Sequence, residues 1–600
     1  MRPTNTISRR DLCGGGLLLA SCQKRRSPYF GRTTVPERQR LSYVLGAEPD
    51  SIDPAYYAGG FEGWVIASLF EGLTAYHPQT MEPIAALATH FEIASGPSPG
   101  IVFFLRGHPL PRGNPLPDTG ALGRQYQAGI LKQDFSRGKS APPASIAARW
   151  SDGSPVTAGD FVYSWRRLAD PRTAAPYAYN LTKVRNADAI QAGKLPPDRL
   201  GVTAVNDYEL LIETNGPPLS LLLLLAIPAL AAVPRWVIER ARSQGRESAW
   251  TDPERIVSNG AFRLTRRIPY ERTIVARNQD YYEAGIVALD EIEFVPVSSG
   301  VTTANLYRSG DIHAMPGERL SPLLQPTLEG HRDFHVAPAC FLICHLFNTR
   351  KAPFNNLLLR YAFNMATDKS AIARCYGAGR LPARNIVPPI AGYDAPQSLH
   401  VPIDGVTYDV LSYDPEAARA LLAKAGYPNG LNRDGRPFRF EVLFPTLPHS
   451  RPIAEMLQQQ WRRNLNVEPN LVMQEFTVWM ESALSLQYSA IAEGGGWPDY
   501  LDPKGFFDWF ANGSPISATG YSDATFDRML AEADGDADPA ARMRKLAECE
   551  RHLLTSMPLI PIYHNVWLYL QKPFVRGMEA NALDKHPFKY VWIDTNWRPS

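Results

Sequence analysis

Apolar positions along the chain follow two different periods, and together they predict a mixed α/β fold. Short runs of alternating or continuous apolar residues predict strands, whereas apolar residues three and four apart predict helices. The strand-like runs are LSYVL (41–45), IVFFLR (101–106), ELLIET (209–214), RTIVAR (272–277), EIEFVPV (291–297) and FRFEVLF (438–444). Strand–helix–strand order through 405–476 predicts an α/β lobe with a largely parallel sheet.

Capping residues indicate where several helices begin and end. We expect a helix in WVIASLFEGLTAYHP (64–78) that Gly72 ends, and another that begins after an N-cap at Thr157 with Asp160 in its first turn. A helix in PEAARALLAKAGYPNG (415–430) should end at Gly426 as its C′ residue. RPIAEMLQQQWRRNLN (451–466) predicts a further helix.

The longest apolar run after the N-terminal region, LSLLLLLAIPALAAV (219–233), is too short to cross a membrane. It has 15 residues and contains Pro228, whereas a spanning helix needs about 20 apolar residues. We interpret it as a buried helix and turn between the lobes of a large domain.

Length and composition narrow the class of protein. A chain of 600 residues is too long for one core and predicts two or three domains. Its apolar content of 44% is ordinary for a globular protein. The formal net charge of +2 argues against nucleic acid as a partner.

The N-terminus has the pattern of an export signal. Arg2, Arg9 and Arg10 precede the short apolar run 12–20, and Ser8-Arg9-Arg10 resembles a twin-arginine signal. LASC (19–22) is similar to a bacterial lipobox, so we expect cleavage after residue 21 and lipidation of Cys22. The alternative is a short buried segment with an incidental cysteine. Residues 22–40 are basic and rich in turn formers, which suits a tether.

The remaining cysteines do not indicate a disulfide framework. Cys340 and Cys344 lie in the strand-like run ACFLICHLF, where four residues span about 13 Å. Strand alternation directs His345 to the other face, so this spacing is also poor for zinc. We expect both cysteines in the core.

Residues 107–149 are dominated by proline and glycine and predict a long surface excursion, with a short helix at 121–135. Gly138-Lys139-Ser140 is similar to the end of a phosphate-binding loop, but Gln133 stands where that loop needs glycine. Motifs of serine hydrolases, zinc proteases and dinucleotide-binding folds are also missing, and the 12 histidines are scattered. We therefore expect no enzyme activity, no cofactor and no metal.

Nine segments in order resemble the oligopeptide- and dipeptide-binding proteins of ABC importers, solute-binding protein family 5. They are SIDP, LFEGL, WSDGSPVTAGDFVYSWRRLADPRTAAPYA, IVSNGAFRL, LYRSGDI, FNTRKAPFNN, ALLAKAGYPNG, WPDYLDP and PLIPIYHN. The resemblance covers nearly all of residues 41–597. The excursion at 107–149 departs from it, because it is longer than the family's usual hairpin.

The resemblance implies an α/β protein of two hinged lobes that close on a ligand. Lobe one would hold residues 41–340 and the C-terminal return 563–600, with an extra subdomain at about 79–204. Lobe two would hold residues 341–562. The chain would cross between the lobes near Cys340 and Tyr563.

The resemblance also implies a ligand site. Asp499 matches the aspartate that receives the α-ammonium of a peptide, and Gly494, Gly495 and Gly496 would pair with the peptide backbone. Trp497 would form the wall of a side-chain pocket. Further residues that the resemblance places at the site are Tyr177, Gly59 and Gly60, with Ala58 in the same loop.

Each of these residues also has a structural interpretation. Gly494–Gly496 could form a simple bend, and Asp499 could cap a helix that starts near residue 503. Ala58 stands where some family members have glutamate, and Glu493 stands near where others have arginine. An arginine for the ligand carboxylate is therefore missing, and His449 or Arg451 is the candidate replacement.

The function that follows is capture of short peptides by a monomeric lipoprotein outside the cytoplasm, in the periplasm or at the outer cell surface. The protein would deliver them to an ABC permease and meet the membrane only through its lipid anchor. The same fold could instead bind a sugar or a metal chelate, or serve as a sensor or chaperone. A secreted hydrolase is the alternative from another class.

Overall fold

The computed structural model describes residues 28–94, 99–109, 112–116, 146–216, 219–317, 320, 324–447, 449–514, 516–536 and 538–599. The predicted export signal, Cys22 and the helix predicted at 121–135 lie outside these residues, as does most of the excursion 107–149. No helix in the described part of the chain is both long and apolar enough to cross a membrane.

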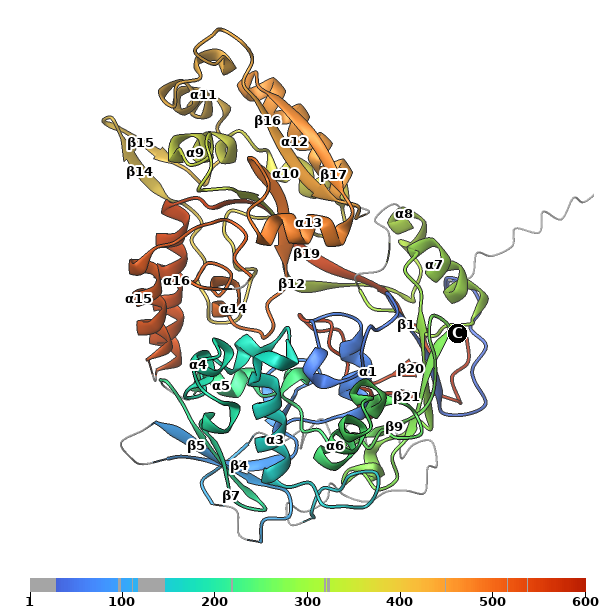
Figure 1. Ribbon diagram of the computed structural model, residues 1–600. Helices are drawn as coiled ribbons and strands as arrows, with labels where there is room; N and C mark the ends of the chain where they lie inside the picture. The colour runs from blue at the N-terminus through green and yellow to red at the C-terminus, as the bar shows by residue number, and fades with distance from the viewer. Residues whose placement is uncertain are drawn as a thin grey trace, which may run out of the picture.

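Two large hydrophobic cores divide the molecule into two lobes, which Figure 1 shows one above the other. The lobe-one core is drawn mainly from residues 41–314 and 574–593. The lobe-two core is drawn mainly from residues 337–569. The lobe boundaries at residues 340 and 563 and the extent of the subdomain stay predictions.

Lobe one contains two larger sheets and two short hairpins. The first sheet has the order β1-β11-β10-β9, with β1 and β11 parallel and the other pairs antiparallel. The second has the antiparallel order β6-β4-β5-β8-β7. Their strands are β1 (Arg40–Leu45), β4 (Ala88–Ile93), β5 (Gly100–Leu105), β6 (Asn114–Pro115), β7 (Val202–Asn206), β8 (Glu209–Glu213), β9 (Phe262–Ile268), β10 (Arg272–Arg277) and β11 (Glu291–Pro296). The hairpins are β2 (Thr74–Tyr76) with β3 (Pro83–Ala85), and β20 (Val575–Arg576) with β21 (Trp592–Ile593).

Short helices pack around these sheets. They are α1 (Glu62–Leu69), α3 (Ala158–Ala169), α4 (Ala187–Gln191), α5 (Leu219–Leu224), α6 (Arg235–Ser243), α7 (Gly300–Ser309) and α8 (Gln325–Leu328). The run 219–233 forms α5 and a 3₁₀ turn at Pro228–Leu230, as its length and its proline predict.

Lobe two is built on one mixed sheet of order β13-β19-β12-β18-β16-β17. Its strands are β12 (Phe334–Phe347), β13 (Leu381–Pro382), β16 (Arg439–Pro445), β17 (Glu468–Gln474), β18 (Ile491–Gly496) and β19 (Leu559–Leu570). The prediction of a largely parallel sheet is wrong. Only β16 pairs in parallel, with β17 and β18, whereas the β12–β18, β12–β19 and β13–β19 pairs are antiparallel. The long strands from outside 405–476 supply the antiparallel pairs.

Helices and one hairpin complete lobe two. The helices are α9 (Leu357–Met365), α10 (Lys369–Tyr376), α11 (Pro415–Lys424), α12 (Ser450–Leu465), α13 (Phe476–Leu484), α14 (Lys504–Phe507), α15 (Ala524–Asp534) and α16 (Pro539–Thr555). The hairpin joins β14 (His400–Ile403) to β15 (Val406–Asp409).

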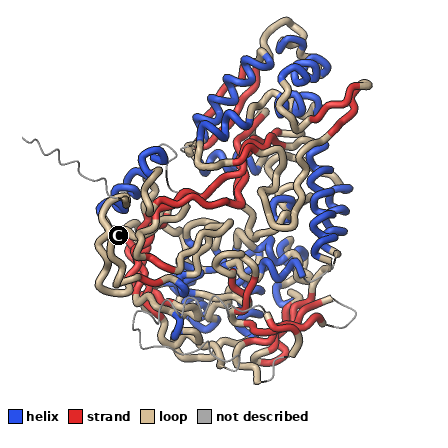
Figure 2. Tube along the Cα trace, turned by 180° about the vertical axis from the view of Figure 1, so that it is seen from behind, coloured by secondary structure: helices blue, strands red, loops and turns tan. Residues whose placement is uncertain are grey.

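Strands β12 and β19 run together between the two lobes, as Figures 1 and 2 show. Their antiparallel register extends from the pair Phe334↔Leu570 to the pair Leu346↔Leu559, with irregularities between residues 338 and 342 and between 343 and 344. Cys340 lies in the first irregular stretch. The two predicted crossing points, Cys340 and Tyr563, thus lie on paired strands that continue from one lobe into the other.

Local signals located most helix ends correctly. Thr157 is the N-cap of α3, and the Thr157 backbone N–H donates to the Asp160 carboxylate at 2.8 Å. Gly426 follows α11 with φ +98°, as a C′ glycine requires. The prediction for Gly72 is wrong, since α1 already ends at Leu69. A Cβ at Gly72 would lie 2.7 Å from the Leu225 carbonyl oxygen, so the glycine instead permits close packing.

The cysteine predictions are confirmed. Cys340 and Cys344 are free and buried in β12. Of the other described cysteines, Cys549 is buried and Cys375 is exposed, and both are free.

Buried ion pairs fasten the end of the chain to the beginning of lobe one. Lys589 donates to Glu71 at 3.1 Å and to Glu283 at 3.0 Å. The Glu71 carboxylate also accepts from the hydroxyls of Tyr281 and Tyr282. These contacts bring three distant parts of the chain into one core.

Glu550 of α16 is a fully buried carboxylate that organises a loop of lobe two. It accepts hydrogen bonds from the backbone N–H groups of Ile386 and Val387 and from the Tyr393 hydroxyl. Burial raises the pKa of Glu550 from 4.5 to about 7, although these donors oppose the shift. The folded protein therefore favours the protonated form more than the unfolded chain does.

We expect Glu550 to make the free energy of unfolding decrease as the pH rises from 4.5 to 7. Below pH 4.5 Glu550 is protonated in both the folded and the unfolded protein. Above pH 7 it is ionised in both, and the free energy of unfolding is lower by about 3 kcal/mol. Glu550→Gln keeps the acceptor and cannot ionise, so denaturant unfolding at pH 5 and 7.5 should show a smaller difference than in the wild type. Glu548→Gln, at an exposed position of the same helix, is the control. An unchanged pH dependence in Glu550→Gln would contradict this assignment.

Candidate functional site

Asp499 of lobe two is bound by two tyrosine hydroxyls of lobe one. Tyr177 donates to Oδ1 at 2.8 Å and Tyr179 donates to Oδ2 at 2.6 Å. The Tyr76 hydroxyl donates to the Asp499 carbonyl oxygen at 3.4 Å. Asp499 and both of its tyrosine donors are partly buried. The structure thus brings together Asp499 and Tyr177, two predicted site residues that are 322 positions apart.

Local backbone geometry positions the two tyrosines. Tyr177 precedes a 3₁₀ turn, Ala178–Leu181, so two side chains spaced two residues apart reach the same carboxylate. Their rings lie 5.4 Å apart, and the Tyr177 ring meets Tyr57 edge to face at 4.8 Å. Gly59 has φ +82°, and a Cβ there would lie 2.2 Å from the Tyr177 hydroxyl. Only glycine therefore fits beside Tyr177.

Lys585 adds a positive charge to this site. Its ammonium donates to the Tyr57 hydroxyl at 3.4 Å and lies 6.0 Å from the ring centre of Tyr76. Burial lowers the pKa of Lys585, while the charge of Asp499 acts in the opposite direction. Burial raises the pKa of Asp499, and the hydrogen bonds from Tyr179 and Tyr177 oppose that rise. The two opposite charges thus share a poorly solvated space between the lobes.

The Asp499 carboxylate still has capacity for a ligand. An ionised carboxylate offers about four acceptor positions, of which the two hydroxyls use two. An ammonium group could therefore bind Asp499 without displacing either tyrosine.

Gly494–Gly496 form the end of β18, and one edge of this segment is already paired. They pair with Cys344, Ile343 and Leu342 of β12. On the other side, β16 pairs with β18 only at Ile491 and Ala492, so no described strand lies beside the glycines there. Gly495 has φ +133°, and a Cβ there would lie 2.3 Å from the Leu342 carbonyl oxygen. The close contact with β12 thus requires glycine at position 495, and no described strand pairs with Gly494–Gly496 on their other edge.

The other predicted site residues have identifiable partners. Trp497 packs edge to face against Phe341 at 5.2 Å and Trp567 at 6.0 Å. The backbone N–H groups of Ala58 and Gly60 donate to the Glu62 carboxylate. His449 lies 3.3 Å from Glu493, so a nearby carboxylate already balances any charge it carries. Arg451 lies 3.4 Å from Glu455 at an exposed position.

The helix-capping interpretation of Asp499 is wrong. Helix α14 begins at Lys504, and its backbone N–H donates to the Asp502 carboxylate at 2.9 Å. The N-cap residue of α14 is Pro503, and the Asp499 carboxylate instead contacts lobe one.

Sequence reasoning missed Tyr179, Tyr57 and Lys585. A signal for Tyr179 was present, because AAPYAYN (174–180) places a second tyrosine two residues after Tyr177. No local signal identified Lys585, since it approaches Asp499 from the C-terminal return.

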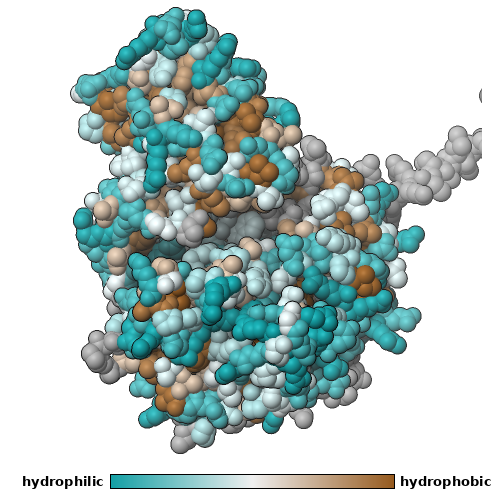
Figure 3. All heavy atoms as spheres, viewed as in Figure 1, coloured by the Kyte–Doolittle hydropathy of each residue, from teal (hydrophilic) through white to brown (hydrophobic). Residues whose placement is uncertain are grey.

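A second polar contact joins the lobes outside this site. The Lys183 ammonium of lobe one donates to Asp534 of α15 at 2.6 Å. Asp534 also lies 3.6 Å from Arg542 and 3.9 Å from Lys504. Figure 3 shows the surface recessed between the two lobes.

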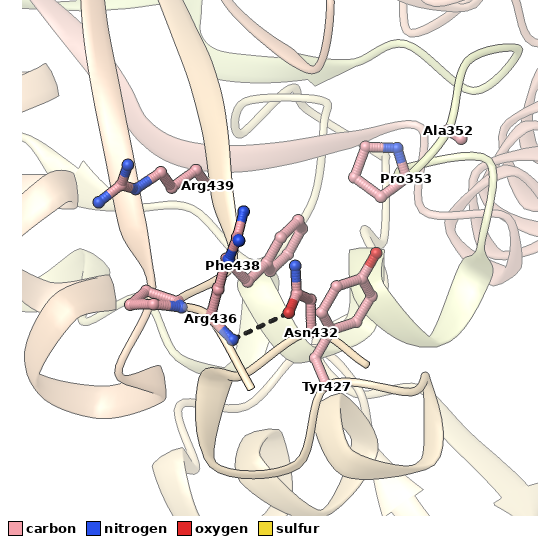
Figure 4. A pocket seen from close by; sticks show the side chains of 8 residues that line it. Ala352, Pro353, Tyr427, Asn432, Arg436, Phe438 and Arg439 are labelled. Atoms are coloured by element: carbon pink, nitrogen blue, oxygen red, sulfur yellow. Dashed lines mark hydrogen bonds between the residues drawn. The ribbon is translucent and has the colours of Figure 1, made fainter. Parts of the chain in front are cut away.

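Figure 4 shows another pocket, which lies within lobe two. Its base contains the stacked rings of Tyr427 and Phe438, 4.1 Å apart. Its rim carries Asn432, Arg436 and Arg439, and Asn432 accepts a hydrogen bond from the Arg436 backbone N–H at 3.0 Å. No residue of lobe one lines it, so closure of the lobes would not enclose a ligand there.

The described residues contain no cluster of three or more His, Cys, Asp or Glu side chains that could hold a metal ion. The polar groups gathered between the lobes are an aspartate, tyrosines and a lysine, together with an open strand edge. These groups suit recognition of a ligand that carries both positive charge and a peptide-like backbone.

Two lobes joined by paired strands, with polar side chains from both meeting at one aspartate, define a two-lobed binding protein. The family model described as "Bacterial extracellular solute-binding proteins, family 5 Middle" matches residues 147–518, more than half of the chain. The chain therefore belongs to this family.

Named relatives match over almost the whole chain. The periplasmic oligopeptide-binding protein OppA of Salmonella typhimurium is 29% identical, covering 98% of this chain and 99% of that protein. The structure of the Escherichia coli murein tripeptide binding protein MppA is 27% identical with a TM-score of 0.74, covering 94% and 99% of the two chains. The Haemophilus influenzae OppA complex with RPPGFSPFR is 26% identical with a TM-score of 0.73, covering 93% and 100%. These matches confirm the two-lobed α/β fold.

We expect Lys183→Met to shift the ligand-free protein toward an open arrangement of the lobes. A partly exposed ion pair contributes about 1 kcal/mol, so its loss should change the ratio of closed to open molecules about fivefold. Small-angle X-ray scattering should then give a larger radius of gyration. Lys424→Met is the matched control, because Lys424 pairs with Asp404 inside lobe two. Identical scattering from Lys183→Met and the wild type would show that this pair does not hold the lobes together.

Proposed function

We propose that this protein captures short peptides between its two lobes and delivers them to an ABC permease. The observation that carries the proposal is Asp499, a carboxylate shared by both lobes and adjacent to an open strand edge. Relatives that match almost the whole chain are named for binding oligopeptides and a murein tripeptide, which supports peptides as the ligand class.

In this proposal Asp499 fixes the orientation of the peptide. The α-ammonium of the ligand binds the carboxylate, and the hydroxyls of Tyr177 and Tyr179 stay bound to it. A charge-assisted hydrogen bond of this kind contributes roughly 1.5–3 kcal/mol. The ligand thereby joins a contact that already bridges the lobes, so its binding favours closure.

The backbone of the peptide would pair with the open edge of Gly494–Gly496. Such pairing uses main-chain groups and does not depend on side-chain identity. Trp497 contributes an apolar wall for a ligand side chain. This division of roles suits a protein that accepts peptides of many sequences.

The alternatives differ in what they would bind or do. A sugar or a metal chelate as ligand would keep the fold but would not need a carboxylate for an ammonium. We propose binding without catalysis, which distinguishes the protein from a secreted hydrolase. Native mass spectrometry of the purified protein should reveal peptides of mixed sequence, and a single sugar or chelate would refute the peptide assignment.

We expect Asp499→Asn to weaken peptide binding more than a hundredfold while preserving the shape of the site. The ammonium would lose its only carboxylate partner in a poorly solvated space, at a cost of about 3–5 kcal/mol. N-acetylated peptides have no ammonium, so they should bind the wild type weakly and lose little more in the mutant. Isothermal titration calorimetry with both peptide forms measures this coupling.

Asp434→Asn, at an exposed position of lobe two, is the control for this experiment. It should bind both peptide forms as the wild type does. Equal losses for free and acetylated peptides in Asp499→Asn would indicate general damage to the site and exclude the proposed ammonium contact.

We also propose that the protein acts outside the cytoplasm as a monomer, attached to the membrane by a lipid on Cys22. The LASC sequence and the preceding arginines support this assignment. Within the predicted tether 22–40, the residues from 28 onward contact the rest of the protein: the Phe30 backbone N–H donates to Asp333 at 2.8 Å, and the Gln39 side chain donates to the Ile593 carbonyl oxygen at 2.8 Å.

Cys22→Ser should move the protein from the membrane fraction to the soluble fraction without changing its affinity for peptides. The reason is that lipidation needs the Cys22 thiol, whereas the ligand contacts come from both lobes. Fractionation followed by immunoblotting measures the first effect and calorimetry the second. Continued membrane association of the mutant would refute the lipid anchor.

A further inference from the structure

Glu493 and His345 form a deeply buried polar pair in the lobe-two sheet. The register pairs His345 of β12 directly with Glu493 of β18, so their side chains project from the same face. Glu493 is 3% exposed and His345 is 0% exposed. A carboxylate at this depth needs hydrogen-bond donors, because burial removes those that water would provide.

The known contacts satisfy only one of the two Glu493 oxygens. Oε1 accepts from the Ser450 hydroxyl at 2.7 Å and lies 3.3 Å from His449 Nε2. Oε2 and both ring nitrogens of His345 are buried without a hydrogen-bond partner among the described residues. The pair can therefore form further hydrogen bonds with another polar group.

Two other donors of lobe two have partners of their own. Arg380 donates to the Asn565 side chain at 3.0 Å and to the Tyr376 carbonyl oxygen at 2.9 Å. The Tyr376 hydroxyl donates to the His449 carbonyl oxygen at 2.8 Å.

The open strand edge provides a route to Glu493. The pairing of β18 with β16 ends at Ala492, so the edge of β18 without a described partner strand begins at Glu493. A ligand that pairs with this edge can therefore place a side chain next to Glu493.

We propose that Glu493 forms a subsite for a positively charged side chain of the ligand, a lysine ammonium or an arginine guanidinium. Such a group supplies the N–H donors that Oε2 lacks and balances its charge. The inference rests on the proposed peptide function and adds a preference within it. The alternative is that a bound water molecule donates these hydrogen bonds to Glu493. Water would create no preference for a positively charged side chain, so a measured preference distinguishes the two.

Calorimetry with a set of alanine peptides, each carrying lysine or uncharged norleucine at one position, tests the subsite. At one position the wild type should prefer lysine by at least tenfold, and Glu493→Gln should reduce the preference to nearly one. Glu441→Gln is the matched control, because Glu441 is exposed on neighbouring β16 and accepts from Ser489 at 2.6 Å. The absence of a lysine preference at every position, or its survival in Glu493→Gln, would overturn the proposal.

A second measurement separates this subsite from the peptide function as a whole. In Asp499→Asn protein, 1,5-diaminopentane should raise the melting temperature more than 1,5-pentanediol does, and adding Glu493→Gln should abolish the difference. If no peptide binds but the diamine effect persists, the subsite stands and the peptide function fails. Equal effects of diamine and diol would overturn the subsite. If Glu493→Gln does not fold, the lysine and norleucine comparison in the wild type decides alone.

Discussion

The pairing of β12 with β19 is the constraint on which the architecture depends. The chain leaves lobe one on β12 and returns on β19, and the antiparallel ladder holds both passages together from residue 334 to residue 346 on the first strand. Irregular pairing around residues 339–341 interrupts that ladder where the strands pass between the cores. Two strands that bend together give the lobes one shared axis of motion, whereas two independent linkers would allow them to separate in any direction.

Electrostatics at the lobe interface follow from this arrangement. Asp499 accepts hydrogen bonds from the hydroxyls of Tyr177 and Tyr179, whereas the Lys585 ammonium donates to the Tyr57 hydroxyl. Neutral donors leave the negative charge of the carboxylate uncompensated by direct pairing. The interface is thus closed by weak, directional contacts and retains its attraction for a cation. A direct ion pair at the same place would hold the lobes closed more firmly, and a ligand would then gain less free energy by binding to Asp499.

Sequence reasoning succeeded where the signal is local and failed where the partner is distant. The strands from LSYVL to FRFEVLF, the cap at Thr157 and the C′ glycine Gly426 follow from nearby residues, and the structure contains them. The predicted strand direction in lobe two was wrong, because β12 and β19 lie outside residues 405–476, on which that prediction was based. The resemblance selected Asp499 and Tyr177, which the structure joins. Tyr179 could have been predicted from the local sequence, whereas Lys585 belongs to the C-terminal return and lies 528 positions from its partner Tyr57.

The C-terminal segment is synthesised last, and it completes lobe one, which forms one side of the ligand site. Lys589 completes the buried cluster at Glu71, and Gln39 exchanges two hydrogen bonds with the backbone of Ile593. A ribosome makes these partners last, so lobe one remains unfinished while lobe two already has nearly all of its core residues. A nascent or prematurely ended chain would therefore lack the residues that complete the core of lobe one. Only the full-length polypeptide can assemble both walls around Asp499.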